Sequence, residues 1–379
     1  MRKNVSNIKP YFSFFPQFTP DPLNDVAWGA GFTDWDLIRK LPESSRDKFT
    51  PAKGMYDPTE PEYLAKLKDE LKDISSGAGI ILYHYFFDGV HVLPGFESEL
   101  MRQNSDLPFF VCWANETWSK RWIGRPNDLI ISQYHHPDKE LIRKHVEYLV
   151  RLFSLPGYTE HKGRPLILIY NPHASKTLQH SLEEYREAFL GLGVNPFIGA
   201  CISYPQSKSQ IELYDFACEF EPRFFFNMGR QPYLARLGAT LKPHYPKIFE
   251  FLGGLHDSFR QKAGHNFFDY SDYLRMLENG TLEQELRSCI GGIPLMRSTF
   301  LSWDNTPRYK DRSTKVIHDD SRFDEAIKLI GKIHSDSDLP LFVNSWNEWT
   351  EGAALEVGKI NHQWRAHFLN SFRGFQGVI

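Results

Sequence analysis

Short apolar runs alternate along the chain with longer stretches in which apolar residues recur every three or four positions. Apolar runs without polar alternation are typical of strands that are covered on both faces, as in a parallel sheet. The chain contains eight such runs, and we predict a strand in each. The predicted strands are Lys9–Phe14, Gly79–Tyr85, Pro108–Trp113, Pro165–Tyr170, Pro196–Ile202, Asp215–Phe220, Ile293–Leu301 and Pro340–Ser345.

The longer stretches between these runs have the periodicity of amphipathic helices. In the stretch 138–153, for example, Leu141, His145 and Leu149 fall on one face. Pro61 is suited to the first turn of a helix, because the N–H that proline lacks has no helical partner there. We therefore predict helices at Pro61–Ile74, Asp138–Phe153, Ser321–Ile333 and Gln363–Arg373.

Eight strands that alternate with helices are typical of a (β/α)8 TIM barrel, an α/β fold. A doubly wound open sheet shows the same alternation, but no G-x-G-x-x-G segment follows a predicted strand. We expect a single barrel domain over residues 1–379, with long first and sixth βα loops at Phe15–Glu60 and Arg223–Asn279. Loops of such length in compact domains are usually functional.

The segment SWNEWTEG follows the last predicted strand and brings two carboxylates close together in the chain. Glu348 and Glu351 are three residues apart, so both could point into a barrel mouth. One could then act as an acid and the other as a base or nucleophile. Indole rings offer flat apolar faces to the C–H faces of sugars. We therefore predict Glu348 and Glu351 as catalytic residues and expect Trp346, Asn347 and Trp349 to bind substrate.

Four further segments combine aromatic and polar residues: FPQF in the first loop, YHYFFD, CWANETWSKRWIG and SWDNTPR after the second, third and seventh strands. We predict that these segments bind a sugar through Gln17, Tyr83, His84, Tyr85, Trp113, Asn115, Glu116, Trp118, Arg121, Trp122, Trp303 and Asp304. A structural reading stays open for several of them. The tryptophans could fill the core, Glu116 could pair with Arg121, and Asp304 could form an ordinary Asx turn.

Metal binding is not expected, because the chain has no H-E-x-x-H motif and His135-His136 reads as loop surface. No cofactor is expected either. The net charge of −3, with both signs interspersed and no basic block, argues against a nucleic-acid partner. The oligomeric state is not predicted.

No apolar stretch approaches the ~18 residues of a membrane span. The N-terminal segment lacks the continuous apolar region of a secretory signal. None of the 4 cysteines forms a C-x-x-C pair, and we predict that they are reduced core residues of a cytoplasmic protein.

In this order, the segments FFPQF, GFTDW, YHYFFDG, CWANETWSKRW, SWDNTPR and SWNEWTEG resemble the WbsX-like family of polysaccharide-biosynthesis proteins. Members of that family carry a domain similar to glycoside hydrolase family 99. The resemblance covers nearly the whole chain, and its last three motifs are long and rich in tryptophan. It implies a (β/α)8 barrel that acts on an oligosaccharide or polysaccharide.

The active carboxylates of glycoside hydrolase family 99 lie in a similar N-E-W-x-E-G segment, which matches Asn347–Gly352 here. The resemblance implies that Glu348 acts as base on the sugar 2-hydroxyl, which attacks its own anomeric carbon and forms a 1,2-anhydro sugar. Glu351 would protonate the leaving oxygen and then act as base for the acceptor, so that configuration is retained. This route is an exception to the usual carboxylate nucleophile and needs a trans 2-hydroxyl, as in an α-mannoside.

The chain departs from the family pattern at Ile123, at Phe86–Asp88 and at Val357. These departures leave both carboxylates in place and concern the shape of the sugar subsites. We expect an enzyme that cleaves or transfers glycosyl units in surface-polysaccharide metabolism. The alternatives are a sugar-nucleotide-dependent glycosyltransferase of O-antigen or capsule biosynthesis and a non-catalytic glycan-binding barrel. Two D-x-D strings, at 34–36 and 336–338, would suit the first alternative but arise easily by chance.

Overall fold

The computed structural model describes residues 8–123, 125–136, 138–205, 211–228, 266–317 and 338–360, with a few positions between 325 and 332 and between 365 and 372. Its main sheet has the strand order β12-β10-β9-β8-β4-β2-β1-β15-β13, and neighbours in this order are parallel. The bounds are β1 (Pro10–Phe14), β2 (Gly79–Phe87), β4 (Phe109–Trp113), β8 (Arg164–Ile169), β9 (Phe197–Ile202), β10 (Phe216–Glu219), β12 (Leu295–Met296), β13 (Ser298–Phe300) and β15 (Leu341–Asn344).

The two ends of this sheet meet, because only Arg297 separates β12 from β13. Ala217 of β10 pairs with Leu295 on one side of that residue, and Ser298 pairs with Phe342 of β15 on the other. β12 and β13 therefore act together as the seventh strand of a closed barrel. All eight predicted strands are present, and the predicted (β/α)8 barrel is confirmed over the open sheet.

Burial explains why the strands were visible as continuous apolar runs. Every residue of β1, β2 and β4 is buried, since one face of each strand fills the barrel and the other packs on helices. The four cysteines are buried and form no disulfide, as predicted. Among the described helices, none combines the length and the apolarity that crossing a membrane requires.

Two of the predicted helices are observed at almost the predicted bounds, as α4 (Pro61–Ile74) and α6 (Lys139–Phe153). Asp138 caps α6, because its side chain accepts hydrogen bonds from the N–H groups of Glu140 and Leu141. The predicted helices at 321–333 and 363–373 lie largely outside the described residues. The other longer helices are α5 (Gly95–Arg102), α7 (Lys176–Gly191), α12 (Tyr270–Glu278) and α13 (Thr281–Ile290).

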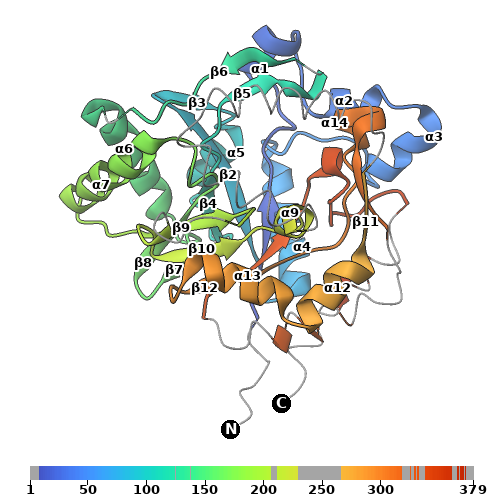
Figure 1. The fold of residues 1–379 in the computed structure, drawn as a ribbon. Coiled ribbons are helices and arrows are strands. Elements are labelled where there is room, and N and C mark those ends of the chain that lie inside the picture. Colours follow the sequence, from blue (N-terminus) through green and yellow to red (C-terminus); the bar gives the residue numbers. More distant parts are fainter. Residues whose placement is uncertain are drawn as a thin grey trace.

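The long first loop folds into α1 (Pro22–Trp28), α2 (Trp35–Arg39), α3 (Glu43–Arg46) and η1 (Asp47–Phe49), which lie along one rim of the barrel (Figure 1). It has a small apolar core of its own, in which Phe18, Trp35 and Phe49 pack against Trp349 of the last loop. The described part of the sixth excursion contributes α9 (Arg223–Met228), β11 (Asn266–Asp269) and α12.

Short elements complete the rim and the outer surface. They are β3 (Val90–Val92), β5 (Trp118–Lys120), η2 (Arg121–Ile123), β6 (Arg125–Ile131), β7 (Glu160–His161), α14 (Thr306–Tyr309), η3 (Lys310–Arg312), β14 (Thr314–Ile317) and η5 (Trp349–Glu351).

Candidate active site

A cavity of about 420 Å³ opens where the loops after the barrel strands converge. Active sites of (β/α)8 enzymes are built at this end of the barrel. Eight of the residues predicted to form the site border the cavity: Gln17, Tyr83, Tyr85, Asn115, Glu116, Trp118, Arg121 and Glu351. The volume lies within the ~300–1,000 Å³ that small-molecule sites usually have.

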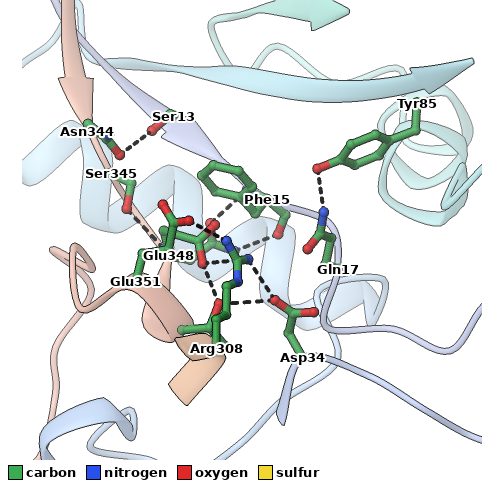
Figure 2. Close-up of polar contacts among 12 residues, drawn as sticks. Ser13, Phe15, Gln17, Asp34, Tyr85, Arg308, Asn344, Ser345, Glu348 and Glu351 are labelled. Atoms are coloured by element: carbon green, nitrogen blue, oxygen red, sulfur yellow. Dashed lines mark hydrogen bonds and ion pairs between the residues drawn. The ribbon is translucent and has the colours of Figure 1, made fainter. Parts of the chain in front are cut away.

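The guanidinium of Arg308 joins three carboxylates at the wall of this cavity (Figure 2). Its Nη1 lies 2.5 Å from Glu351 Oε1, and its Nη2 lies 3.1 Å from Glu348 Oε1 and 3.0 Å from Asp34 Oδ2. Arg308 comes from α14, Asp34 from the first loop and both glutamates from the loop after β15. The two predicted catalytic carboxylates therefore bind the same cation, and both glutamates are buried.

The charges of this cluster do not balance unless one carboxyl holds a proton. A second guanidinium, that of Arg223, lies 3.8 Å from Glu351, so two cations face three carboxyls. Burial, together with the charges of Glu351 and Asp34, raises the pKa of Glu348 to about 8, although the attraction of Arg308 lowers it. Burial also raises the pKa of Asp34. We infer that the cluster carries a proton near neutral pH.

Glu351 and Glu348 occupy different depths. Glu351 borders the cavity, whereas Glu348 is 1% exposed and lies beneath Arg308. Thr350 Oγ1 lies 2.6 Å from Glu348 Oε1 and 3.1 Å from Asp34 Oδ2. Glu348 Oε2 is buried and has no hydrogen-bond partner among the described residues. A buried carboxyl oxygen without a protein partner is rare, and a bound water or ligand is a usual explanation for one.

Asn347 anchors the loop that carries both glutamates. Its side-chain amide accepts from the N–H of Phe15 at 2.8 Å and donates to the carbonyl of Phe15 at 2.9 Å. The N–H of Trp346 donates to the carbonyl of Ser13 at 2.8 Å, and the N–H of Glu348 donates to Ser345 Oγ at 3.0 Å. These bonds fix the glutamate loop against the first strand and its loop.

Gly352 closes this loop against the segment that carries Arg308. Its φ is +61°, and a Cβ there would lie 2.9 Å from the carbonyl oxygen of Asp304 and 3.0 Å from its nitrogen. We expect Gly352→Ala to lower the free energy of unfolding by about 1–3 kcal/mol, since both the conformation and the contact are unfavourable for a side chain. Chemical denaturation would check this. Gly193→Ala, also at positive φ but with nothing within 4 Å, is the matched control, and an equal loss in both variants would refute the contact with Asp304.

Several predicted substrate-binding residues do not border the cavity. Trp346 and Trp349 are 0% and 1% exposed and pack in the core, and Trp349 donates to Glu356 at 3.3 Å. Trp113 is also buried and donates to the carbonyl of Phe86. Their places favour a structural role, because a sugar ring could not reach these indoles.

The SWDNTPR segment also differs from its predicted use. Trp303 is 4% exposed and packs near Phe226. Asp304 accepts from the N–H of Thr306 at 3.1 Å in an Asx turn and pairs with Lys48 at 2.7 Å. The residue of this segment that borders the cavity is Arg308, which was not among the predicted site residues.

Histidines account for two further differences. His84 faces away from the cavity, and His135, predicted to be loop surface, is 2% exposed and lies 3.3 Å from Asn115 Nδ2.

The side chain of Trp122 lies outside what the structure describes. In the D-x-D string of the first loop, Asp34 pairs with Arg308 and Asp36 with Arg39, so the two carboxylates serve different partners. The second string lies partly outside the described residues.

The cavity also has walls that the sequence did not predict. They include Phe15, Trp28, Asp34, Tyr170, Asn171, Phe220, Arg223 and Arg308. Tyr170 and Asn171 directly follow β8, so their position after a barrel strand was an available signal. Arg223 stacks over the rings of Tyr170 and Phe220 at 5.9 Å from each, and it leaves 42% of its side chain exposed beside Glu351.

Comparison with known proteins assigns the chain to a family. A family model described as glycosyltransferase WbsX matches residues 11–371. Two curated relatives, both named uncharacterized protein WxcX, come from strains B100 and ATCC 33913 of Xanthomonas campestris pv. campestris. Each is 28% identical over an alignment of 366 positions, which covers 93% of this chain and 48% of the relative. The chain thus spans about half the length of these relatives.

The chain was also compared with solved structures, and one of them agrees with its architecture. A glycoside hydrolase-like protein aligns over 100% of this chain and 96% of its own, with a TM-score of 0.59 and 9% identity. The GH99 endo-alpha-mannosidase from Bacteroides thetaiotaomicron aligns over 97% of both chains, with a TM-score of 0.48 and 12% identity. The first likeness concerns the fold alone. By the family model, which covers nearly its whole length, the chain belongs to the WbsX glycosyltransferase family, a family of enzymes that act on glycans.

Proposed function

We propose that this chain cleaves or transfers a glycosyl unit of an oligosaccharide or polysaccharide, with Glu348 and Glu351 as its catalytic carboxylates. The observation that carries the proposal is the convergence of both glutamates on Arg308 at the wall of an aromatic-lined cavity. Trp118 borders that cavity with a half-buried indole that can offer a flat face to a sugar ring, and Tyr83 and Tyr85 border it although they are 4% and 3% exposed. Asn115, Glu116 and Gln17 supply donors and acceptors for hydroxyl groups.

The depths of the two glutamates support different tasks. Glu351 borders the cavity and can reach a leaving oxygen, as expected of a general acid. Glu348 offers the buried Oε2, which has no hydrogen bond within the described part of the chain, to a sugar 2-hydroxyl. In this scheme the 2-hydroxyl loses its proton to Glu348 while its oxygen bonds the anomeric carbon. The bond from that carbon to the leaving oxygen breaks as Glu351 protonates that oxygen.

Arg308 has a defined part in this scheme. The guanidinium of Arg308 contacts Glu348, so a substrate hydroxyl can reach Glu348 only if this guanidinium leaves room for it. Arg308 also holds Asp34 and Glu351, so it can keep one carboxylate bond while it yields another. We propose that substrate binding loosens the contact between Arg308 and Glu348.

A product screen tests the proposed reaction. The protein would be incubated with α-linked oligosaccharides and sugar nucleotides, and NMR would follow the anomeric centre of each product. Hydrolysis or transfer with retained configuration supports the proposal. An inverted product rules out the anhydro-sugar route, and binding without turnover over the whole panel favours a glycan-binding barrel.

The raised pKa of Glu348 predicts the pH above which activity falls. The mechanism needs one protonated glutamate as acid and one ionised glutamate as base, so the pair must carry a single proton. The pKa of about 8 marks the pH at which that proton leaves, whichever glutamate holds it in the transition state. We expect kcat/KM to fall tenfold per pH unit above about 8. A profile from pH 5 to 10, with circular dichroism at each pH to confirm folding, checks this, and a flat profile from 7 to 9.5 would contradict it.

A sugar-nucleotide donor is the second candidate, and the arginines at the cavity favour it. Arg121 and Arg223 border the cavity, and a guanidinium fork suits a diphosphate. Calorimetry with sugar nucleotides, with and without Mn²⁺, separates the candidates. Binding that is lost in Arg223→Gln but kept in Arg275→Gln, an exposed site on α12, would support the nucleotide donor.

We further propose a cytoplasmic setting, supported by the four buried cysteines that form no disulfide.

A further inference from the structure

The outer face of β2 faces a cluster of two histidines and a glutamate that the proposed reaction does not use. Tyr83 and Tyr85 point into the cavity, so His84, between them, points to the opposite face of the strand. There it meets His91 of β3 and Glu97 of α5. These three residues come from separate elements and are only seven and six positions apart in the chain. No familiar motif has this spacing, which is why the sequence predicts no metal site.

The three side chains offer their donor atoms to a common point. One donor atom from each lies within 4.8 Å of the other two. His84 Nδ1 lies 2.8 Å from Glu97 Oε1, and His91 Nε2 lies 3.1 Å from Glu97 Oε2. The second pair is close but lacks the geometry of a hydrogen bond, and neither atom has another hydrogen-bond partner among the described residues. Glu97 is 2% exposed, so its unsatisfied oxygen is a buried one.

A second layer of hydrogen bonds orients His84. Its Nε2 lies 2.8 Å from Nε2 of His145 on α6, and His145 Nδ1 lies 2.8 Å from the hydroxyl of Tyr185. When His145 Nε2 accepts a hydrogen bond from His84 Nε2, the other nitrogen of His84, Nδ1, is left to bind an ion in place of the proton that it shares with Glu97 Oε1. Metal-bound histidines usually hold their second nitrogen in this way.

An ion has a path to the cluster. A surface hollow beside His91 is lined by Phe86, Tyr148 and the charged side chains Lys144, Glu147 and Arg151. The side chain of His91 is 17% exposed toward solvent, whereas those of His84 and Glu97 are 0% and 3% exposed. His91 therefore stands at the entrance, and the other two donors lie behind it.

We propose that His84, His91 and Glu97 bind one divalent transition-metal ion. Two imidazoles and one carboxylate form a donor set typical of zinc, with a further position for water. The ion would join β2, β3 and α5 directly behind the strand that presents Tyr83 and Tyr85 to the cavity. It would thus stiffen one wall of the cavity without entering it.

Metal titration of the full chain, treated first with a chelator, tests this proposal. Calorimetry with ZnCl₂ should show one ion per chain, and saturating Zn²⁺ should raise the Tm by several degrees, because an ion that binds only the folded state stabilises it. Mg²⁺ should give neither effect. His91→Gln should weaken Zn²⁺ binding at least tenfold, whereas His180→Gln, an exposed histidine on α7, should leave it unchanged.

Two outcomes would overturn the proposal. Failure to bind Zn²⁺, or equal binding by the wild type and His91→Gln, would mean that the three residues form only a buried hydrogen-bonded network. If the variant does not fold, X-ray absorption of the Zn²⁺-loaded wild type still tests the proposal, because it identifies the ligands of the zinc ion. Two imidazole nitrogens in the zinc shell support the site, and sulfur ligands or a single imidazole refute it. None of these measurements depends on glycan turnover, so the metal site can fail its test while the proposed function stands, and the reverse also holds.

Discussion

Glu351→Gln is expected to lower turnover by about 10²-fold or more, the usual effect of losing a general acid. Glutamine keeps the shape of the side chain and can still accept from Arg308, which lies 2.5 Å from Glu351 Oε1. It cannot donate a proton to a leaving oxygen. The fold should therefore survive while the chemical step slows. The measurement is kcat and kcat/KM on the best substrate found in the product screen.

The leaving group distinguishes a lost acid from a distorted site. In an aryl glycoside with an acidic phenol, the phenolate can leave without being protonated. Glu351→Gln should therefore lose much less activity on this substrate than on an oligosaccharide. Glu183→Gln on α7, whose side chain is 72% exposed, controls for the substitution itself and should keep full activity. Full activity of Glu351→Gln, or an equal loss on both substrates, would remove the proposed role.

The barrel could be predicted from the sequence because each of its strands is buried on both faces. β2 is the clearest case, since all nine of its residues from Gly79 to Phe87 are buried. The closure of the barrel at Arg297 left no such signal: a single polar residue divides β12 from β13 inside one apolar run.

The site was predicted less completely, for a physical reason. Trp346 and Trp349 stand next to the glutamates in sequence, but indoles also fill cores, and composition cannot tell the two uses apart. Alternation along β2 could have shown that His84 opposes Tyr83 and Tyr85. The contact between Asp34 and Arg308 spans 274 positions and depends on how two loops meet, which no local pattern reveals.

Arg308→Met is expected to destabilise the protein by about 3–5 kcal/mol at pH 7.5, because it leaves buried carboxylates without their cation. The side chain of Arg308 is 8% exposed, and those of Asp34 and Glu348 are 5% and 1% exposed. Chemical denaturation measures the change. Arg275→Met, at a side chain that is 71% exposed, should change stability by no more than about 0.5 kcal/mol. Arg308→Lys keeps the positive charge but loses the planar guanidinium that can bond several carboxylates at once. Its loss of stability should therefore be larger than that of Arg275→Met and smaller than that of Arg308→Met.

The pH dependence of this loss tells electrostatics from packing. The pKa of Glu348 is already raised to about 8 by burial, and without Arg308 the carboxyls of the cluster should hold their protons to still higher pH. Protonated carboxyls need no cation, so the deficit of Arg308→Met should shrink as the pH falls from 7.5 to 5. A deficit that is equal at both pH values would mean that Arg308 acts through its packing. In that case the two glutamates would not depend on Arg308 for their charge state, and the inference that the cluster shares one proton would fail.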